Sequence, residues 1–284
     1  MIHRFPTPTP PRLTIEFRSG SIAIRTDDVD ETTVELRGRR DNEATSDLIA
    51  ETTIEQRGDE IVVLVPKRSG GLFGRSTDLY LTVTGPRSTA LAIQSGSADI
   101  TADGDYGTSR VDTGSGDVIV GHIAGSARLR SGTGDVRVEK IDGDVDIGAG
   151  SGDVQLGAVR GSVVAQTGSG DVRLGSGGTA LEVKTGSGDV TVGDAPDRVS
   201  AKTGSGDVSI DSVRRGEVKA QTASGDIRAG VHAGTAAWLD VRTVSGRVSS
   251  DLQAADEPSG GEDRVRLQLE SVSGDIELVK VSEG

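Results

Sequence analysis

Residues 149–190 read AGSGDVQLGAVRGSVVAQTGSGDVRLGSGGTALEVKTGSGDV, and this stretch decides the fold. A six-residue phrase ending in Gly-Ser-Gly-Asp-Val returns in it every 18 residues. Related phrases begin at Gln94, Thr113, Ser131 and Thr203 and, with looser spacing, at Thr222, Thr243 and Ser271. A fixed period of this length is typical of a solenoid, in which each repeat is one structural unit that stacks on its neighbours.

Apolar residues recur at fixed places within each repeat. After Asp153 they are Val154, Leu156, Val159, Val163 and Ala165. Their alternation within each half has a period of two, which indicates strands, while the glycine content and the β-branched residues argue against helix. Each repeat therefore holds two short strands separated by glycine-bearing corners, and these strands bury their apolar faces only when coils stack about 4.8 Å apart.

We therefore predict an all-β fold, a single-stranded parallel β-helix (β-solenoid) with about 18 residues per coil. We expect it to be right-handed, because parallel crossovers usually are. Residues 1–11 are predicted to be a flexible proline-rich leader, and residues 12–284 a single solenoid domain. In that domain we expect irregular coils and a cap at 12–93, regular coils at 94–230, and longer coils at 231–284 with a surface loop at 251–263.

Two features of the irregular parts carry their own predictions. The stretch TTIEQRGDEIVVLVP from Thr52 indicates a hairpin or an elongated coil. Bulky side chains, Phe17, Phe73 and Tyr80, are expected to close the core at the first end, whereas the second end holds Trp238, the only tryptophan, but no obvious bulky cap.

The composition narrows the function. Aromatic residues make up 2% of the chain and glycine supplies 41 residues, so the core is expected to be thin and long, unlike that of an α/β enzyme. Periodic β-branched residues argue against disorder. The net charge of -13 opposes nucleic-acid binding, since phosphates require an excess of Lys and Arg. We find no signal-like or membrane-spanning apolar stretch, so we expect no direct membrane insertion and a cytoplasmic location.

A small residue precedes each glycine-rich corner and has inward parity. These residues are Ser131, Ala149, Thr167, Thr185, Thr203 and Thr222. We predict a buried hydroxyl ladder, in which the hydroxyls bond to one another or to nearby backbone.

The spaced Ser/Thr-Gly-Ser-Gly-Asp-Val phrase, with coils ending in Val-x-Val-x-Thr, resembles a family of bacterial β-strand-repeat proteins called putative adhesins of unknown function, or Toastrack domains. The resemblance covers nearly the whole chain. It implies a β-helical scaffold without established catalytic residues or cofactors, and a link to envelope-stress membrane proteins, beside which family members are often encoded or to which they are fused.

One column of charged residues needs an explanation. Aspartates recur at the corner from Asp99 to Asp226, at about the strand spacing, where neighbouring charges repel by about 0.9 kcal/mol in water. One reading is that each carboxylate accepts hydrogen bonds from N–H groups of its own turn. The alternative is a calcium-binding column formed by Asp117, Asp135, Asp153, Asp171, Asp189 and Asp207, although calcium-binding β-rolls carry Asp at both corners and here the second corner has no regular carboxylate.

No catalytic residue is predicted. Enzymes built on a β-helix break the repeat locally at their carboxylates, whereas this column is uniform, and His3, His122 and His232 stand in no triad or metal spacing. Two functions remain. The first is a scaffold that binds a protein partner on its end or face. The second is a self-assembling protein, polymerising end to end as bactofilin-like β-helices do, through an exposed last coil at Val265–Val281.

Overall fold

The computed structural model describes residues 1–40, 42–66, 78–252 and 263–282 of the 284-residue chain. Its contacts group into two compact units, residues 1–143 and 144–284, and each unit is described by itself. The prediction of one solenoid domain over residues 12–284 stays a prediction. Among the described residues, no helix has the length and apolar character needed to cross a membrane.

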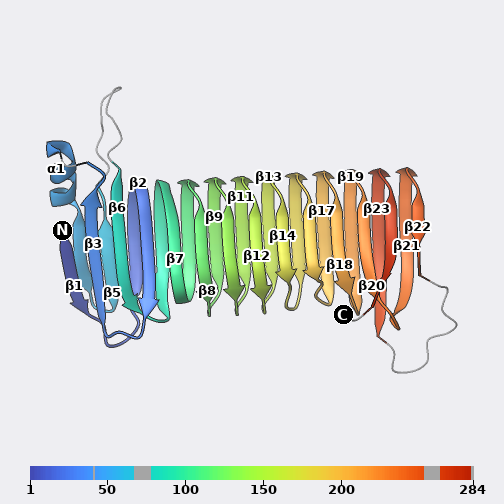
Figure 1. Cartoon of the computed structure of the whole chain (residues 1–284), viewed down its shortest axis with the longest axis horizontal. Coiled ribbons are helices and arrows are strands. Elements are labelled where there is room, and N and C mark those ends of the chain that lie inside the picture. Colours follow the sequence, from blue (N-terminus) through green and yellow to red (C-terminus); the bar gives the residue numbers. More distant parts are fainter. Residues whose placement is uncertain (41, 67–77, 253–262, 283–284) are drawn as a thin grey trace. The chain divides into compact units, whose positions relative to one another are not determined.

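Unit 2 contains the regular coils. Each coil has one strand on each of two faces, and strands on the same face pair in parallel with those of the next coil (Figure 1). One face holds β11 (Val145–Ser151), β13 (Val163–Ser169), β15 (Leu181–Ser187), β17 (Arg198–Ser205) and β19 (Gly216–Ser224). The other holds β12 (Val154–Val159), β14 (Val172–Ser176), β16 (Val190–Asp194), β18 (Val208–Val213) and β20 (Ile227–His232). The predicted β-solenoid is thus confirmed.

The register places equivalent residues of successive coils against each other. Val154 pairs with Val172, and Val172 pairs with Val190, an interval of 18 residues. All three valines are at most 1% exposed. Burying such a side chain stabilises the fold by about 1.5–3 kcal/mol relative to leaving it in water, so the repeated valine column is the main source of cohesion.

The hydroxyl ladder lies in the same core, next to the glycine-rich corner. All six predicted positions are buried. The Thr203 hydroxyl donates to the Gly188 carbonyl at 3.1 Å, and the Thr222 hydroxyl donates to the Gly206 carbonyl at 3.0 Å. The Thr203 and Thr222 hydroxyls therefore bond the backbone of the preceding coil's corner rather than one another, whereas those of Ser131 and Thr167 are buried without a hydrogen-bond partner among the described residues.

Unit 1 contains coils of the same kind, but their spatial order departs from the sequence order. They are built from β2 (Arg12–Asp27), β7 (Thr89–Ser115), β8 (Val118–Ile123), β9 (Ala127–Thr133) and β10 (Val136–Ile141). The first half of β2 pairs in parallel with both β7 and β5 (Glu60–Leu64), and its second half pairs with both β7 and β6 (Leu79–Pro86). The first coil in the sequence therefore lies between two later segments.

The cap of unit 1 corrects three predictions. Residues 1–11 are not a flexible leader throughout, because β1 (Ile2–Pro6) pairs antiparallel with β3 (Glu31–Gly38). A helix, α1 (Glu43–Glu51), lies beside β3 and was not predicted; Asn42 caps it by accepting from the Thr45 N–H at 2.9 Å. Tyr80 is 42% exposed and does not fill the core.

Two other predictions about the cap have different outcomes. Phe17 is buried, as expected, and Phe73 lies outside the described residues. The predicted hairpin is confirmed, because β4 (Thr53–Arg57) pairs antiparallel with β5 through a turn in which Gly58 has a φ of 64°.

The C-terminal coils of unit 2 also change order. They are formed by β21 (Ala236–Ser245), β22 (Val248–Ser250), β23 (Arg264–Ser273) and β24 (Ile276–Val281). β23 pairs with β19 on one side and β21 on the other, and β24 lies likewise between β20 and β22 (Figure 1). The predicted last coil, Val265–Val281, is therefore an inner coil, and residues 236–250, the end coil, lie at the edge of the unit.

The other C-terminal predictions concern Trp238 and the loop. Trp238 lies in the end coil and is 53% exposed. Most of the predicted loop at 251–263 lies outside the described residues, since 253–262 are not described.

Candidate functional site

The aspartate column forms a hydrogen-bonded ladder between coils. The backbone N–H of Asp189 donates to Asp171 Oδ1 at 2.9 Å, and that of Asp207 donates to Asp189 Oδ1 at 2.8 Å. The same contact joins Asp117 to Asp99, Asp135 to Asp117, Asp171 to Asp153, Asp226 to Asp207 and Asp275 to Asp226. The sequence had suggested that the donors lie in the aspartate's own turn. They belong instead to the next coil.

This geometry does not favour the calcium alternative. In the proposed calcium ligands Asp117, Asp153, Asp171, Asp189 and Asp207, one carboxylate oxygen is directed at an N–H group, while calcium requires six to eight oxygen ligands at about 2.3–2.6 Å. Over the described part of the chain, no group of three or more His, Asp or Glu side chains is placed to hold a metal ion. Chelation tests the hypothesis directly, since removal of a bound calcium would lower the melting temperature.

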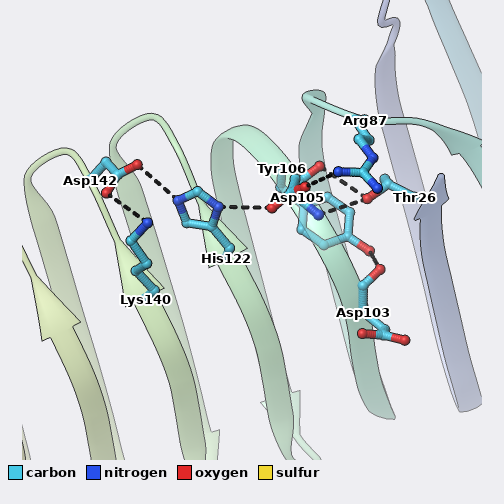
Figure 2. Close-up of polar contacts among 8 residues, drawn as sticks. All are labelled: Thr26, Arg87, Asp103, Asp105, Tyr106, His122, Lys140 and Asp142. Carbon is cyan, nitrogen blue, oxygen red and sulfur yellow. Dashed lines mark hydrogen bonds and ion pairs between the residues drawn. The ribbon is translucent and has the colours of Figure 1, made fainter. Parts of the chain in front are cut away.

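A second polar cluster lies in unit 1, where His122 joins two carboxylates from other coils (Figure 2). His122 Nδ1 lies 2.9 Å from Asp105 Oδ1, and Nε2 lies 2.9 Å from Asp142 Oδ2. Arg87 contacts the Asp105 carboxylate at 3.2 Å, and Lys140 contacts that of Asp142 at 3.5 Å. Arg87, His122 and Lys140 therefore alternate with the two carboxylates along the cluster, which ties successive coils together.

Tyr106 fills the core beneath this cluster (Figure 2). Its hydroxyl oxygen lies 2.9 Å from the Ile24 carbonyl and 2.8 Å from the Asp103 carbonyl. Burial, followed by the nearby Asp103 charge, raises the pKa of Tyr106 well above its ordinary value. The hydroxyl is therefore a hydrogen-bond donor to the backbone and not an acid–base group.

The end coil of unit 2 is the part of the described chain best suited to binding. Its inward-facing side chains continue the core columns, and no coil of the described residues lies above them. Leu239 pairs with Leu267, yet Leu239 is 39% exposed and Leu267 is fully buried. Val248 pairs with Ile276 and is 51% exposed, whereas Ile276 is fully buried.

The outer surface beside this end carries further apolar side chains. Trp238 lies under the Arg266 guanidinium, which is 4.2 Å from the ring centroid, and Val244 is 82% exposed. Val244 and Val272 occupy the position that is glycine in the regular repeats, such as Gly204. An apolar stripe thus appears only in the coils nearest this end.

A groove of about 550 Å³ runs along this stripe. It is lined by Lys202, Thr203, Gln221, Thr222, Ala223, Arg242, Val244, Glu270, Ser271 and Val272. The Gln221 amide donates to the Glu270 carboxylate at 2.6 Å and lowers the pKa of Glu270, so this side chain stays charged. An apolar floor with both signs of charge at its rim is the composition of a protein-binding surface rather than of a catalytic cleft.

Sequence reasoning missed both the His122 cluster and the end coil. The cluster had a weak signal, because Asp105 and Asp142 lie 17 and 20 residues from His122, close to one coil on either side. The end coil had none, since residues 236–250 and 264–281 carry the same apolar pattern and either could have been outermost.

The chain belongs to the Toastrack family, DUF4097, whose family model matches residues 11–211 and 143–279. A search of curated proteins finds no match.

Several solved structures resemble the chain in fold. A putative adhesin from Bacteroides fragilis is 12% identical, with 98% of this chain and 96% of that chain covered and a TM-score of 0.44. A putative adhesin from Parabacteroides merdae is 10% identical, with 98% and 95% covered and a TM-score of 0.38. A putative lipid-binding protein from Parabacteroides distasonis is 12% identical, with 98% and 96% covered and a TM-score of 0.37.

Proposed function

We propose that this protein is a non-catalytic solenoid scaffold that binds a protein through the end coil of unit 2 and the adjoining groove. The observation that carries the proposal is the exposure of core-column residues, such as Leu239 and Val248, whose partners one coil away are fully buried. Contiguous exposed apolar side chains rimmed by charges mark protein-binding sites, and an uncovered strand edge adds backbone hydrogen-bonding groups to the same surface.

The rest of the described chain supports a structural role. The carboxylates of the aspartate ladder, and ladder hydroxyls such as that of Thr203, make hydrogen bonds between coils. The His122 cluster does the same in unit 1. A cytoplasmic location and a role in envelope-stress signalling, both expected from the sequence and its family resemblance, are part of this proposal; cell fractionation tests the former.

Substitution of Val244 and Val272 by Asp tests the binding surface. Both side chains are exposed, so the variant should fold with an unchanged melting temperature while a partner captured by the wild type is lost. The matched control is Ile119→Asp, because Ile119 is an exposed apolar residue of unit 1 outside the surface. Equal capture by the wild type, the control and the double variant would contradict the proposal.

Self-association is the second candidate, and the unpaired edge of β21 favours it. Within the described residues β21 pairs only with β23, so its other side offers free N–H and C=O groups. Light scattering over a range of concentrations separates the candidates: a monomer at every concentration argues against self-association and leaves the capture of another protein open.

A further inference from the structure

The free edge of β21 has a definite hydrogen-bonding pattern. The Ala236 N–H donates to the Asp263 carbonyl at 2.9 Å, on the β23 side. Because backbone groups alternate sides along a strand, the N–H and C=O groups of Ala237, Leu239, Val241 and Thr243 point away from β23. Within the described part of the chain, the end coil therefore presents a row of unpaired backbone donors and acceptors beside its exposed inward side chains.

The sequence of this edge is complementary to itself when reversed. Residues 236–245 read AAWLDVRTVS, and Val241 stands near their centre. If two copies of β21 run antiparallel about a two-fold axis at Val241, Asp240 of each copy faces Arg242 of the other. In the same register Trp238 faces Val244, which pairs the two most exposed apolar side chains of the strand.

The inward side chains match in the same register. Leu239 faces Thr243 of the second copy, and Val241 faces its own equivalent. Since these residues lie above the buried column of Val265, Leu267 and Leu269, the second copy would close the open core with apolar contacts. The backbone hydrogen bonds, the facing charges and the apolar contacts are therefore all satisfied in the same register. Side chains that face each other across antiparallel strands must match in this way.

The cap of unit 1 covers its core, although among the described residues β1 pairs only with β3 and Ile2 is 59% exposed. There Leu48 of α1 and Ile54 of β4 are buried, and so are Val34 and Leu36 of β3. A filament needs two different complementary patches, whereas a two-fold contact uses one patch twice and closes at two copies.

We propose that two copies of this chain form a closed dimer by antiparallel pairing of β21 about Val241. This proposal rests on the end coil being the binding surface, and it names a second copy as the occupant.

Charge reversal tests the register. Asp240→Arg places like charges opposite Arg242 of the second copy, and Arg242→Asp places like charges opposite Asp240. Each variant alone should dimerise at least about tenfold more weakly than wild type in analytical ultracentrifugation. An equimolar mixture of the two, in which every facing pair is again opposite in charge, should recover dimers, and this recovery also shows that both variants are folded.

Disulfide trapping tests the geometry in a chain that has no cysteine of its own. Positions 238 and 244 would form non-hydrogen-bonded pairs across the dimer, with Cα atoms about 4.5 Å apart, a separation that a disulfide can span. A mixture of Trp238→Cys and Val244→Cys should cross-link under mild oxidation. Trp238→Cys alone, or mixed with the control Val272→Cys, should not.

Three results would overturn the proposal. They are a wild type that stays monomeric at all concentrations, a dimer indifferent to both charge reversals, and species that grow beyond two with concentration. None of these results contradicts the proposed binding function. That function would be contradicted only if the Val244 and Val272 substitutions left partner capture unchanged.

Discussion

The repeated aspartate is explained by hydrogen bonding rather than by charge. Each carboxylate accepts from the N–H that follows the corner of the next coil, as Asp189 does from Asp207 at 2.8 Å. Like charges at the coil spacing oppose this arrangement by only about 0.9 kcal/mol in water, and salt reduces that further. A charge-assisted hydrogen bond to backbone contributes more, so the column is stable without a bound cation.

Asp189→Asn and Asp189→Ala separate the two effects. Asn keeps a carbonyl acceptor and removes the repulsion, so its free energy of unfolding should equal or slightly exceed that of the wild type. Ala removes the acceptor and should lower the free energy of unfolding by about 1 kcal/mol in urea denaturation. Equal losses from both substitutions would show that the negative charge itself, and hence a cation, stabilises the column.

Tyr106 predicts how stability changes at alkaline pH. Its pKa is raised in the folded protein above the ordinary value of 10.0, so the folded state holds the phenolic proton more tightly than the unfolded state. The stabilisation is fully present below pH 10 and is lost as the pH rises above it. Melting temperatures between pH 9 and 11.5 should fall less steeply for Tyr106→Phe than for wild type, with the exposed Tyr80→Phe as the matched control.

At the scale of the element, the corner glycine sets how closely coils approach. Gly188 has a φ of +141°, and a Cβ at this position would lie 2.1 Å from the Gly170 carbonyl oxygen. Only glycine allows both the backbone angle and the contact. The residues of the Gly-Ser-Gly-Asp phrase therefore act together: the second glycine allows the backbone of the neighbouring coil to approach closely, and the aspartate accepts a hydrogen bond from the next coil.

Gly188→Ala should lower the free energy of unfolding by about 3 kcal/mol, since strain and overlap both act. Gly58→Ala is the control, because Gly58 also has a positive φ, +64°, but nothing lies within 4 Å of an added Cβ. It should cost about 1 kcal/mol. Similar losses from the two substitutions, measured by denaturant titration, would show that the close approach between coils is unimportant.

At the largest scale, successive coils present equivalent residues to their neighbours, so one coil can take the place of another in the stack. Val154 pairs with Val172 and Val172 with Val190, while on the other face Val163 pairs with Leu181 and Leu181 with Val199. If the middle coil were removed, Val154 would pair with Val190, and Val163 would pair with Val199. Stability in such a stack is a sum over coils and their nearest-neighbour contacts.

Deletion of residues 172–189, one complete repeat of 18, should give a folded protein whose melting temperature lies within about 5 °C of the wild type. Deletion of residues 172–188 shifts every later residue by one position and turns inward side chains outward. Circular dichroism and thermal melting should show a cooperative transition for the first variant and none for the second. Equal behaviour would mean that the column register does not hold the fold.

The solenoid, its coil length and the two ladders could be predicted from the sequence alone. Each of these depends on a local pattern, as in Val154 to Val163, that neighbouring repeats copy in register. Strands of the same pattern pair with one another in successive repeats, so one repeat of the sequence forms one coil of the structure. The buried Thr203 and Thr222 followed from the same parity.

The sequence does not predict how the coils are ordered at the two irregular regions, or which coil therefore lies at the edge. The inward residues Leu239 and Leu267 are the same amino acid in the same pattern, yet one is 39% exposed and the other fully buried. Any two coils with matching columns stack equally well, so local pattern does not rank them. In the structure β23 lies between β19 and β21, so β21 is the strand at the edge among the described residues and the one that the proposed second copy would pair with.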